Sequence, residues 1–124
     1  MKKITTPSAP AAIGPYSQAI IANGMLYTSG QIPIDPQTGN IVSGGIEAQT
    51  HQAFANVRNL VEAAGITMSH VVKVTVYMAD MADFATVNTI YEQYFTAPYP
   101  ARSAVAVKQL PKGALIEIET IAQM

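Results

Sequence analysis

Two segments near the C-terminal end, PARSAVAVKQL (residues 100–110) and IEIE (residues 116–119), carry the clearest structural pattern in this chain. Both have the side-chain alternation that is typical of strands. The intervening Pro111-Lys112-Gly113 has the composition of a turn. The pattern therefore predicts two consecutive strands joined by a short turn, with a cation near the start of the first strand and carboxylates on the second.

Arg102 is the residue of greatest chemical interest in the first of these strands. Because side chains alternate along a strand, Arg102 and Ala104 are expected on one sheet face. A guanidinium that faces a neighbouring strand bearing a carboxylate suits recognition of a small organic acid, since arginine binds a carboxylate through two parallel charge-assisted bonds. A surface ion pair is the more ordinary role for such a residue, and residue chemistry alone favours it.

The rest of the chain alternates between turn-rich and apolar-periodic segments. Asn23-Gly24 is a dipeptide favoured in tight hairpins. The apolar spacing of residues 46–64 fits one face of a helix, for which Gly65 supplies the stop. In chain order we expect an extended loop at 8–15, strands at 17–22 and 25–32, a surface loop at 33–45, a helix at 46–64, a strand at 71–78 and a helix at 83–95 capped by Asp83.

This order of elements predicts a single α+β domain over residues 1–124, with two helices on one face of a sheet. Two helices can cover only one face, so the other face is left open. We expect the open face to mix polar and apolar side chains, namely Lys73, Thr75, Tyr77, Arg102 and Glu117 with Leu115 and Ile121 between them. Such a face is too apolar for water and too polar for a core, which indicates a subunit interface containing polar clefts.

The composition favours association of copies and argues against several function classes. Hydrophobic residues make up 49% of the 124 residues and charged residues only 12%, which leaves much apolar surface on a monomer. A net charge of −1 without a basic stripe argues against nucleic acid as a partner. Cysteine is absent, which removes disulfides, thiolate ligands and a cysteine nucleophile. No membrane-spanning run or secretory leader is recognisable, so we expect a cytoplasmic protein.

Few residues indicate catalysis by themselves. The two histidines lack the paired spacing of a zinc site, so no metal site is predicted, and no phosphate-binding loop or nucleophile elbow is present. Four places are candidates for a functional site, each with an ordinary structural alternative. They are Tyr16 at the end of a stiff loop (or simple packing), Ser29-Gly30 after a strand (or a bulge), Asn88 on the second helix (or a cap of loop backbone) and Glu117 on the last strand (or a solvated acid).

Four motifs at matching spacing extend over most of the chain. They are Ala12-Ile13-Gly14-Pro15-Tyr16-Ser17-Gln18, Thr28-Ser29-Gly30-Gln31-Ile32-Pro33, Asp83-Phe84-Ala85-Thr86-Val87-Asn88, and Pro100-Ala101-Arg102-Ser103 with Ile116-Glu117-Ile118-Glu119. Together they resemble the Rid family, and most closely its deaminase A group, from about Ala11 to Ala122. The resemblance implies a chorismate-mutase-like α+β fold with a mixed sheet. It also implies a homotrimer with three clefts between adjacent subunits.

The resemblance further implies an activity in metabolite damage control. Deaminases of this family hydrolyse reactive 2-imino acids and their enamine tautomers, such as 2-iminobutanoate and 2-iminopropanoate, to 2-keto acids and ammonia, without a cofactor or metal. By motif position, Arg102 would hold the substrate carboxylate with help from the backbone N–H of Gly30, and Glu117 would position or activate water. Tyr16 and Ser29 would line the cleft, Asn88 would support it, and the backbone at Ala104 would contact the substrate.

Two departures from the family pattern leave the substrate range open. Many relatives have cysteine where this chain has Ala104, and the connection at residues 96–99 is shorter than is usual in the family. A regulatory module that binds 2-keto or imino acids through Arg102 without turnover is the second functional hypothesis. RNA cleavage with translation inhibition, which has been linked to family members, ranks third because the charge of this chain argues against RNA affinity.

Overall fold

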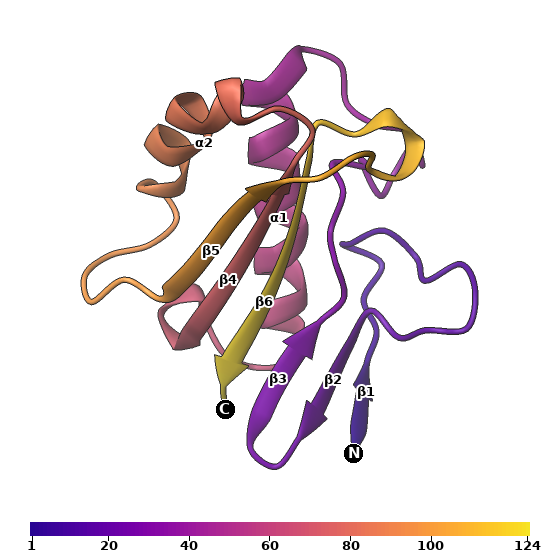
Figure 1. Cartoon of the computed structure of the whole chain (residues 1–124). Coiled ribbons are helices and arrows are strands. Elements are labelled where there is room, and N and C mark those ends of the chain that lie inside the picture. Colours follow the sequence, from indigo (N-terminus) through magenta and orange to yellow (C-terminus); the bar gives the residue numbers. More distant parts are fainter.

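The computed structural model describes residues 1–124 as a layer of helices on a six-stranded sheet (Figure 1). In chain order the elements are β1 (Lys2–Ile4), β2 (Ala19–Ala22), β3 (Met25–Thr28), α1 (Gly45–Ala63), η1 (Met68–His70), β4 (Val71–Met78), η2 (Met81–Asp83), α2 (Phe84–Tyr91), β5 (Ala101–Ala106), η3 (Pro111–Gly113) and β6 (Ile116–Gln123), where η marks a short 3₁₀ turn. The strand order is β1-β2-β3-β6-β4-β5, and only β4 and β5 pair in parallel. The α+β class and the mixed sheet are confirmed.

The hairpin of β2 and β3 forms where the sequence predicts it. Asn23 and Gly24 have φ values of 51° and 74°, the two left-handed residues that a two-residue hairpin turn needs. β3 is shorter than the predicted strand, because beyond Thr28 only Gln31 pairs, through an isolated bridge to Ile118. The chain therefore leaves the regular sheet directly after β3.

The predicted helix at 46–64 is α1, and its apolar stripe packs against the sheet. The stripe is wholly buried at Ala53, Phe54, Val57, Leu60 and Val61. The helix ends just before Gly65, whose φ of 89° is the left-handed conformation that commonly follows a helix. This helix and α2 together cover one side of the sheet.

The second helix is shorter than predicted and begins differently. α2 ends at Tyr91, and turns follow it, because the N–H groups of Gln93 and Tyr94 bond to carbonyls three residues back instead of four. Asp83 occupies the predicted N-cap position of α2, but its side chain makes no capping hydrogen bond. Instead, Asp80 accepts a hydrogen bond from the N–H of Ala82 at 2.9 Å and so caps η2. Because η2 runs directly into α2, the helix needs no further side-chain cap.

The two C-terminal strands follow one another along the chain with η3 between them, as predicted, but they are not neighbours in the sheet. β4 lies between them, parallel to β5 and antiparallel to β6. A parallel pair needs a crossover connection, and α2 provides it between β4 and β5. After η3 the chain places β6 in the middle of the sheet. This central position suits β6 because every second side chain of the strand is buried, namely Ile116, Ile118, Thr120 and Ala122. β5 is left as a free edge.

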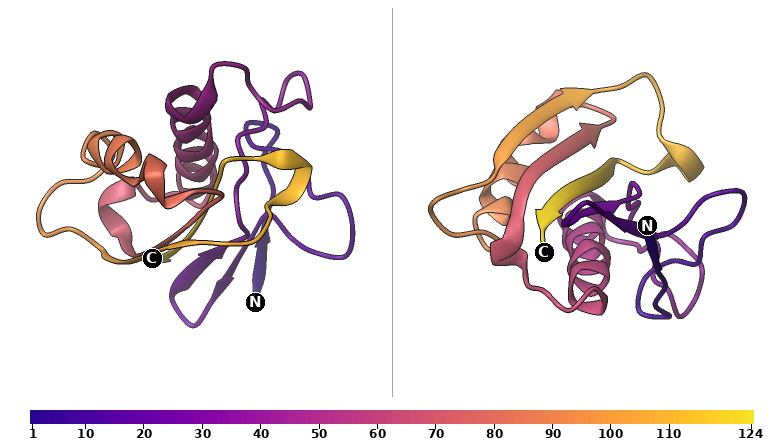
Figure 2. Two further views of the ribbon diagram at one scale, coloured as in Figure 1. Left: turned by 45° about the horizontal axis from the view of Figure 1, so that its top comes forward. Right: turned by 90° about the horizontal axis from the view of Figure 1, so that it is seen from below.

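Arg102 lies on the helix-covered face, so its predicted place on the open face is wrong. In the register of β4 and β5 it stands beside Val74, which is fully buried under the helices. Tyr77 and Glu117 are opposite one another on the other face, as predicted. The left view of Figure 2 shows both helices on one side of the sheet. Side-chain alternation correctly groups Arg102 with Ala104, but it does not fix which of the two faces meets the helices.

Two local features of the sheet escaped prediction. A bulge between Val71 and Lys73 reverses the expected alternation at the start of β4, so that Val71 is buried and Val72 exposed. β1 pairs with β2 at the other edge of the sheet, where the sequence gives no strand signal. Neither helix combines the length and the apolar character needed to cross a bilayer.

Candidate functional site

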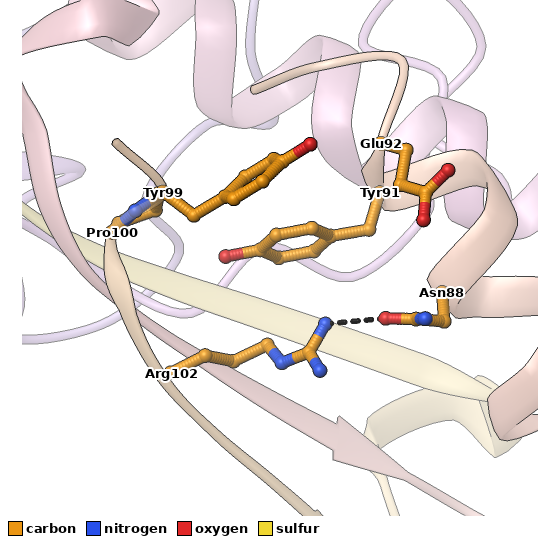
Figure 3. Close-up of a pocket in the computed structure, with 6 residues that line it drawn as sticks. All are labelled: Asn88, Tyr91, Glu92, Tyr99, Pro100 and Arg102. Carbon is orange, nitrogen blue, oxygen red and sulfur yellow. Dashed lines mark hydrogen bonds between the residues drawn. The ribbon is translucent and has the colours of Figure 1, made fainter. Parts of the chain in front are cut away.

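Arg102 projects from the edge strand β5 toward α2 (Figure 3). Its Nη1 donates a hydrogen bond to Oδ1 of Asn88 at 2.7 Å. The guanidinium carbon lies 4.7 Å from the ring centre of Tyr91 and 5.3 Å from that of Phe84, which is within cation–π range. This bond occupies one of the five N–H donors of the Arg102 guanidinium. The guanidinium therefore keeps an edge that can bind a carboxylate through two hydrogen bonds.

A cavity of about 340 Å³ lies beside this guanidinium. We call it the arginine pocket, and its lining is Asn88, Tyr91, Glu92, Tyr99, Pro100 and Arg102. Tyr91 is only 4% exposed, and its hydroxyl has no hydrogen-bond partner within the chain. Burial raises the pKa of Tyr91, and the positive charge of Arg102 offsets part of that increase. The pocket is therefore an amphipathic cleft in which Arg102 is the only cation.

A second cavity, of about 390 Å³, contains the acid from β6. We call it the glutamate pocket; it is lined by Tyr16, Gly30 and Glu117 together with residues of the N-terminal loop and of η3. The Glu117 side chain packs directly on the backbone of Gly30, since a Cβ at that glycine would lie 2.8 Å from the carboxyl carbon. Gly30 is thus a point of close approach between a side chain and the backbone, where any larger residue would displace the carboxyl.

The environment of Glu117 is suited to proton transfer. Burial raises the pKa of its carboxyl above the ordinary value of 4.5, and the negative charge of Glu119 raises the pKa further. Tyr77 donates a hydrogen bond to Glu119 at 2.8 Å, and this bond is the main cause of the raised pKa of Tyr77. A carboxyl whose pKa moves toward neutrality is a better general acid near pH 7 than an exposed one.

The other predicted site residues lie around these two pockets. Tyr16 is 53% exposed at the rim of the glutamate pocket. Ser29 lines neither pocket, because its hydroxyl donates to the carbonyl of Ser17 at 2.6 Å and fixes the loop before the hairpin. Ala104 shares the face of Arg102 and packs against the core. Asn88 lines the arginine pocket and binds Arg102 rather than loop backbone.

Comparison with known proteins assigns the chain to a family. The family described as Endoribonuclease L-PSP, which comprises the Rid proteins, matches residues 6–124. This chain belongs to the Rid family. It is 52% identical to the 2-iminobutanoate/2-iminopropanoate deaminase of Salmonella typhimurium, covering 98% of this chain and 96% of that protein. It is 56% identical to a RutC family protein of Pyrococcus horikoshii, covering 96% and 94%.

The fold of this Rid chain also matches solved structures over its whole length. The structure of Escherichia coli TdcF with bound serine superposes with a TM-score of 0.95 at 45% identity, covering 100% of this chain and 99% of that one. The expected Rid fold is therefore confirmed at the level of the single chain.

Within one Rid chain the two pockets are separate. Arg102 lies on the helix-covered face and Glu117 on the open face, and the pockets share no lining residue. A substrate of a few atoms therefore does not reach both residues of the same chain. Each chain therefore presents one pocket that contains Arg102 and a separate pocket that contains Glu117 together with Lys112.

Sequence reasoning missed most of the lining of the arginine pocket. Tyr91 was predicted only as part of the second helix, while Glu92 and Tyr99 were not predicted to line a cleft. The available signal was the spacing of Phe84, Asn88 and Tyr91, which places an amide between two aromatic rings on one helix face. That pattern does not reveal that an arginine from another element lies against it.

Proposed function

We propose that this protein is a deaminase that hydrolyses 2-imino acids, including 2-iminobutanoate and 2-iminopropanoate, to 2-keto acids and ammonia. The observation that carries the proposal is the held guanidinium of Arg102, with Nη1 on Asn88 and a free edge beside a cavity. The deaminase name of the Salmonella relative and the bound serine in the TdcF structure support a small carboxylate-bearing substrate. The reaction needs no metal or cofactor in this account.

The proposed working form is a homotrimer with its clefts between adjacent copies. Arg102 and Glu117 lie on opposite faces of one chain, so one copy would supply the arginine pocket and its neighbour the glutamate pocket. The free edge at β5 and the exposed apolar side chains of the open face, Tyr27 and Val105, are the surfaces expected to be covered by neighbours. A cleft of this kind closes only when the copies assemble.

The chemistry follows from these positions. The substrate carboxylate binds the free edge of Arg102, and the backbone N–H of Gly30 provides a further donor. Protonation of the imine nitrogen makes C2 a stronger electrophile, and water adds to C2 to give a carbinolamine. Collapse of that intermediate breaks the C–N bond and releases ammonia and the 2-keto acid. Glu117 is the proton-handling group, since its raised pKa suits transfer and a guanidinium does not give up its proton.

The test is 2-ketobutyrate formation from 2-iminobutanoate generated in situ by threonine dehydratase. Wild type should accelerate it, whereas Arg102→Ala should match the reaction without added protein. Arg58→Ala is the matched control, because Arg58 also lies over a tyrosine, at 5.7 Å from the Tyr94 ring centre, but lines neither pocket. No acceleration by wild type would instead support a module that binds 2-keto or imino acids without turnover.

The family description keeps RNA cleavage as a second candidate. A net charge of −1 argues against it, because affinity for a polynucleotide rests mainly on cationic contacts to phosphate. An RNA complex whose dissociation constant rises steeply with salt would favour this candidate. Absence of such a complex together with imine turnover would exclude it.

A further inference from the structure

The guanidinium of Arg102 is held on three sides by α2. The rings of Tyr91 and Phe84 approach the guanidinium carbon to 4.7 and 5.3 Å, and Asn88 accepts the hydrogen bond from Nη1. An arginine on an exposed edge strand otherwise samples many rotamers, and ordering it on ligand binding lowers affinity. A side chain that is already ordered avoids that loss.

Tyr91 is the most deeply buried of the three residues that contact Arg102. It is 4% exposed, and its ring packs on the edge of Phe54 at 5.7 Å and on Phe95 at 4.7 Å between ring centres. The ring therefore has a fixed orientation set by the core. Figure 3 shows its face against the guanidinium and its hydroxyl at the end remote from Asn88. The contact with Arg102 is thus made by the ring and not by the hydroxyl.

We propose that Tyr91 is a positioning residue for Arg102, acting through the face of its ring to present the free guanidinium edge to a carboxylate. The proposal rests on the proposed function only in assigning that carboxylate to a 2-imino or 2-keto acid. Phe84 provides a second, weaker face, because its ring lies farther away and is less buried. The ordinary alternative is that Tyr91 is a core residue without influence on Arg102.

The experiment compares Tyr91→Leu and Tyr91→Phe with the control Phe95→Leu. Phe95 is 5% exposed and packs on Tyr91, but it makes no cation–π contact with Arg102. Leucine keeps an apolar side chain against the Tyr91 ring, which the edge of Phe54 still holds, so this control removes an aromatic neighbour without removing the ring face on Arg102. Affinity for 2-ketobutyrate is measured by calorimetry, and KM and kcat are measured with 2-iminobutanoate. Tyr91→Leu should weaken binding about three- to thirtyfold, the range of one cation–π contact. Phenylalanine should restore the affinity, and Phe95→Leu should lower thermal stability without weakening binding.

A ligand-free readout separates this proposal from the proposed function. In wild type the Nε–H proton of Arg102 should be shifted upfield by the ring current of Tyr91 and should show restricted motion in ¹⁵N relaxation. Both signatures should vanish in Tyr91→Leu and persist in Tyr91→Phe and Phe95→Leu. Phe84→Leu, which removes a less buried ring, gives a partial loss of the shift and serves if Tyr91→Leu does not fold.

Two results would overturn the proposal. One is an Arg102 signal that is unchanged in Tyr91→Leu, or changed equally in Phe95→Leu. The other is a Tyr91→Phe variant that loses as much affinity as Tyr91→Leu, which would assign the effect to the hydroxyl. If wild type neither binds 2-ketobutyrate nor turns over the imine, the proposed function fails while the ligand-free signals still decide the role of Tyr91.

Discussion

Gly30 is the position where the smallest possible change should do the most damage to the proposed chemistry. In Gly30→Ala the added methyl would lie 2.8 Å from the carboxyl carbon of Glu117 and 3.1 Å from its Cγ and Oε2. Ordinary contact begins near 3.4 Å. The carboxyl must therefore move by about 0.6 Å or more, and displacements of about 1 Å in an active site lower rates by roughly 100-fold. We expect kcat to fall roughly 10- to 100-fold.

The same substitution should leave the fold nearly unchanged. Gly30 does not have a positive φ, so alanine adopts its backbone conformation without strain. The atoms that it displaces belong to the end of a flexible side chain rather than to backbone. Thermal unfolding followed by circular dichroism should show a midpoint within a few degrees of wild type, since exposed or adaptable sites change stability by about 0.5 kcal/mol.

A double-mutant cycle with Glu117→Gln isolates the cause. If Gly30→Ala acts by displacing the carboxyl, it should lower kcat much less in the Glu117→Gln background than in wild type. Iminobutanoate hydrolysis is measured for all four proteins under the conditions of the threonine dehydratase assay. An equal fractional loss in both backgrounds, or full activity in Gly30→Ala, would refute the reasoning from the 2.8 Å approach.

The remaining predictions concern charge and packing. Burial raises the pKa of Glu117, so the folded state binds its proton more tightly than the unfolded state, and wild type should lose stability relative to Glu117→Gln as pH rises through and above 4.5. Urea titrations at pH 4 and pH 7 check this; a wild type that gains stability over the variant would reverse the sign. Arg102→Lys should raise KM roughly 10- to 100-fold, because lysine does not bind a carboxylate through a planar pair of donors. Unchanged steady-state kinetics would show that the paired N–H donors of Arg102 do not bind the substrate carboxylate. Phe54→Ala should lower the free energy of unfolding by about 3–5 kcal/mol, since its ring is fully buried among three aromatic neighbours. A loss below about 1 kcal/mol in urea denaturation would mean that the core closes around the cavity.

Local pattern was sufficient for the parts of the fold that local chemistry dictates. The apolar spacing of residues 46–64 predicts α1, and Asn23-Gly24 predicts the hairpin, because both signals depend only on residues close in sequence. The Rid motifs add the family. Strand order was not predictable in this way, since the alternation of β5 and β6 does not say that β4 lies between them.

The site was predicted as a set of residues but not as an arrangement. Arg102, Glu117 and Gly30 were identified from motifs, yet alternation alone left the face of Arg102 undetermined, and the predicted face was wrong. The contact between Gly30 and Glu117 joins residues far apart in sequence and depends on the chain leaving the sheet after β3. The aromatic support of Arg102 was hidden for the same reason, because Tyr91 alone has the sequence signature of a core residue.

The most direct test of the whole account is complementation between Arg102→Ala and Glu117→Gln. Each variant alone should be strongly impaired in 2-iminobutanoate hydrolysis. The two variants are mixed in equal amounts, dissociated and reassembled. A cleft is then intact when its arginine comes from a Glu117→Gln copy and its glutamate from an Arg102→Ala copy. Random assembly of a ring with clefts between adjacent copies should therefore restore about one quarter of wild-type activity. Activity that stays at the level of the separate variants, in particles shown to be mixed, would contradict a site shared between copies.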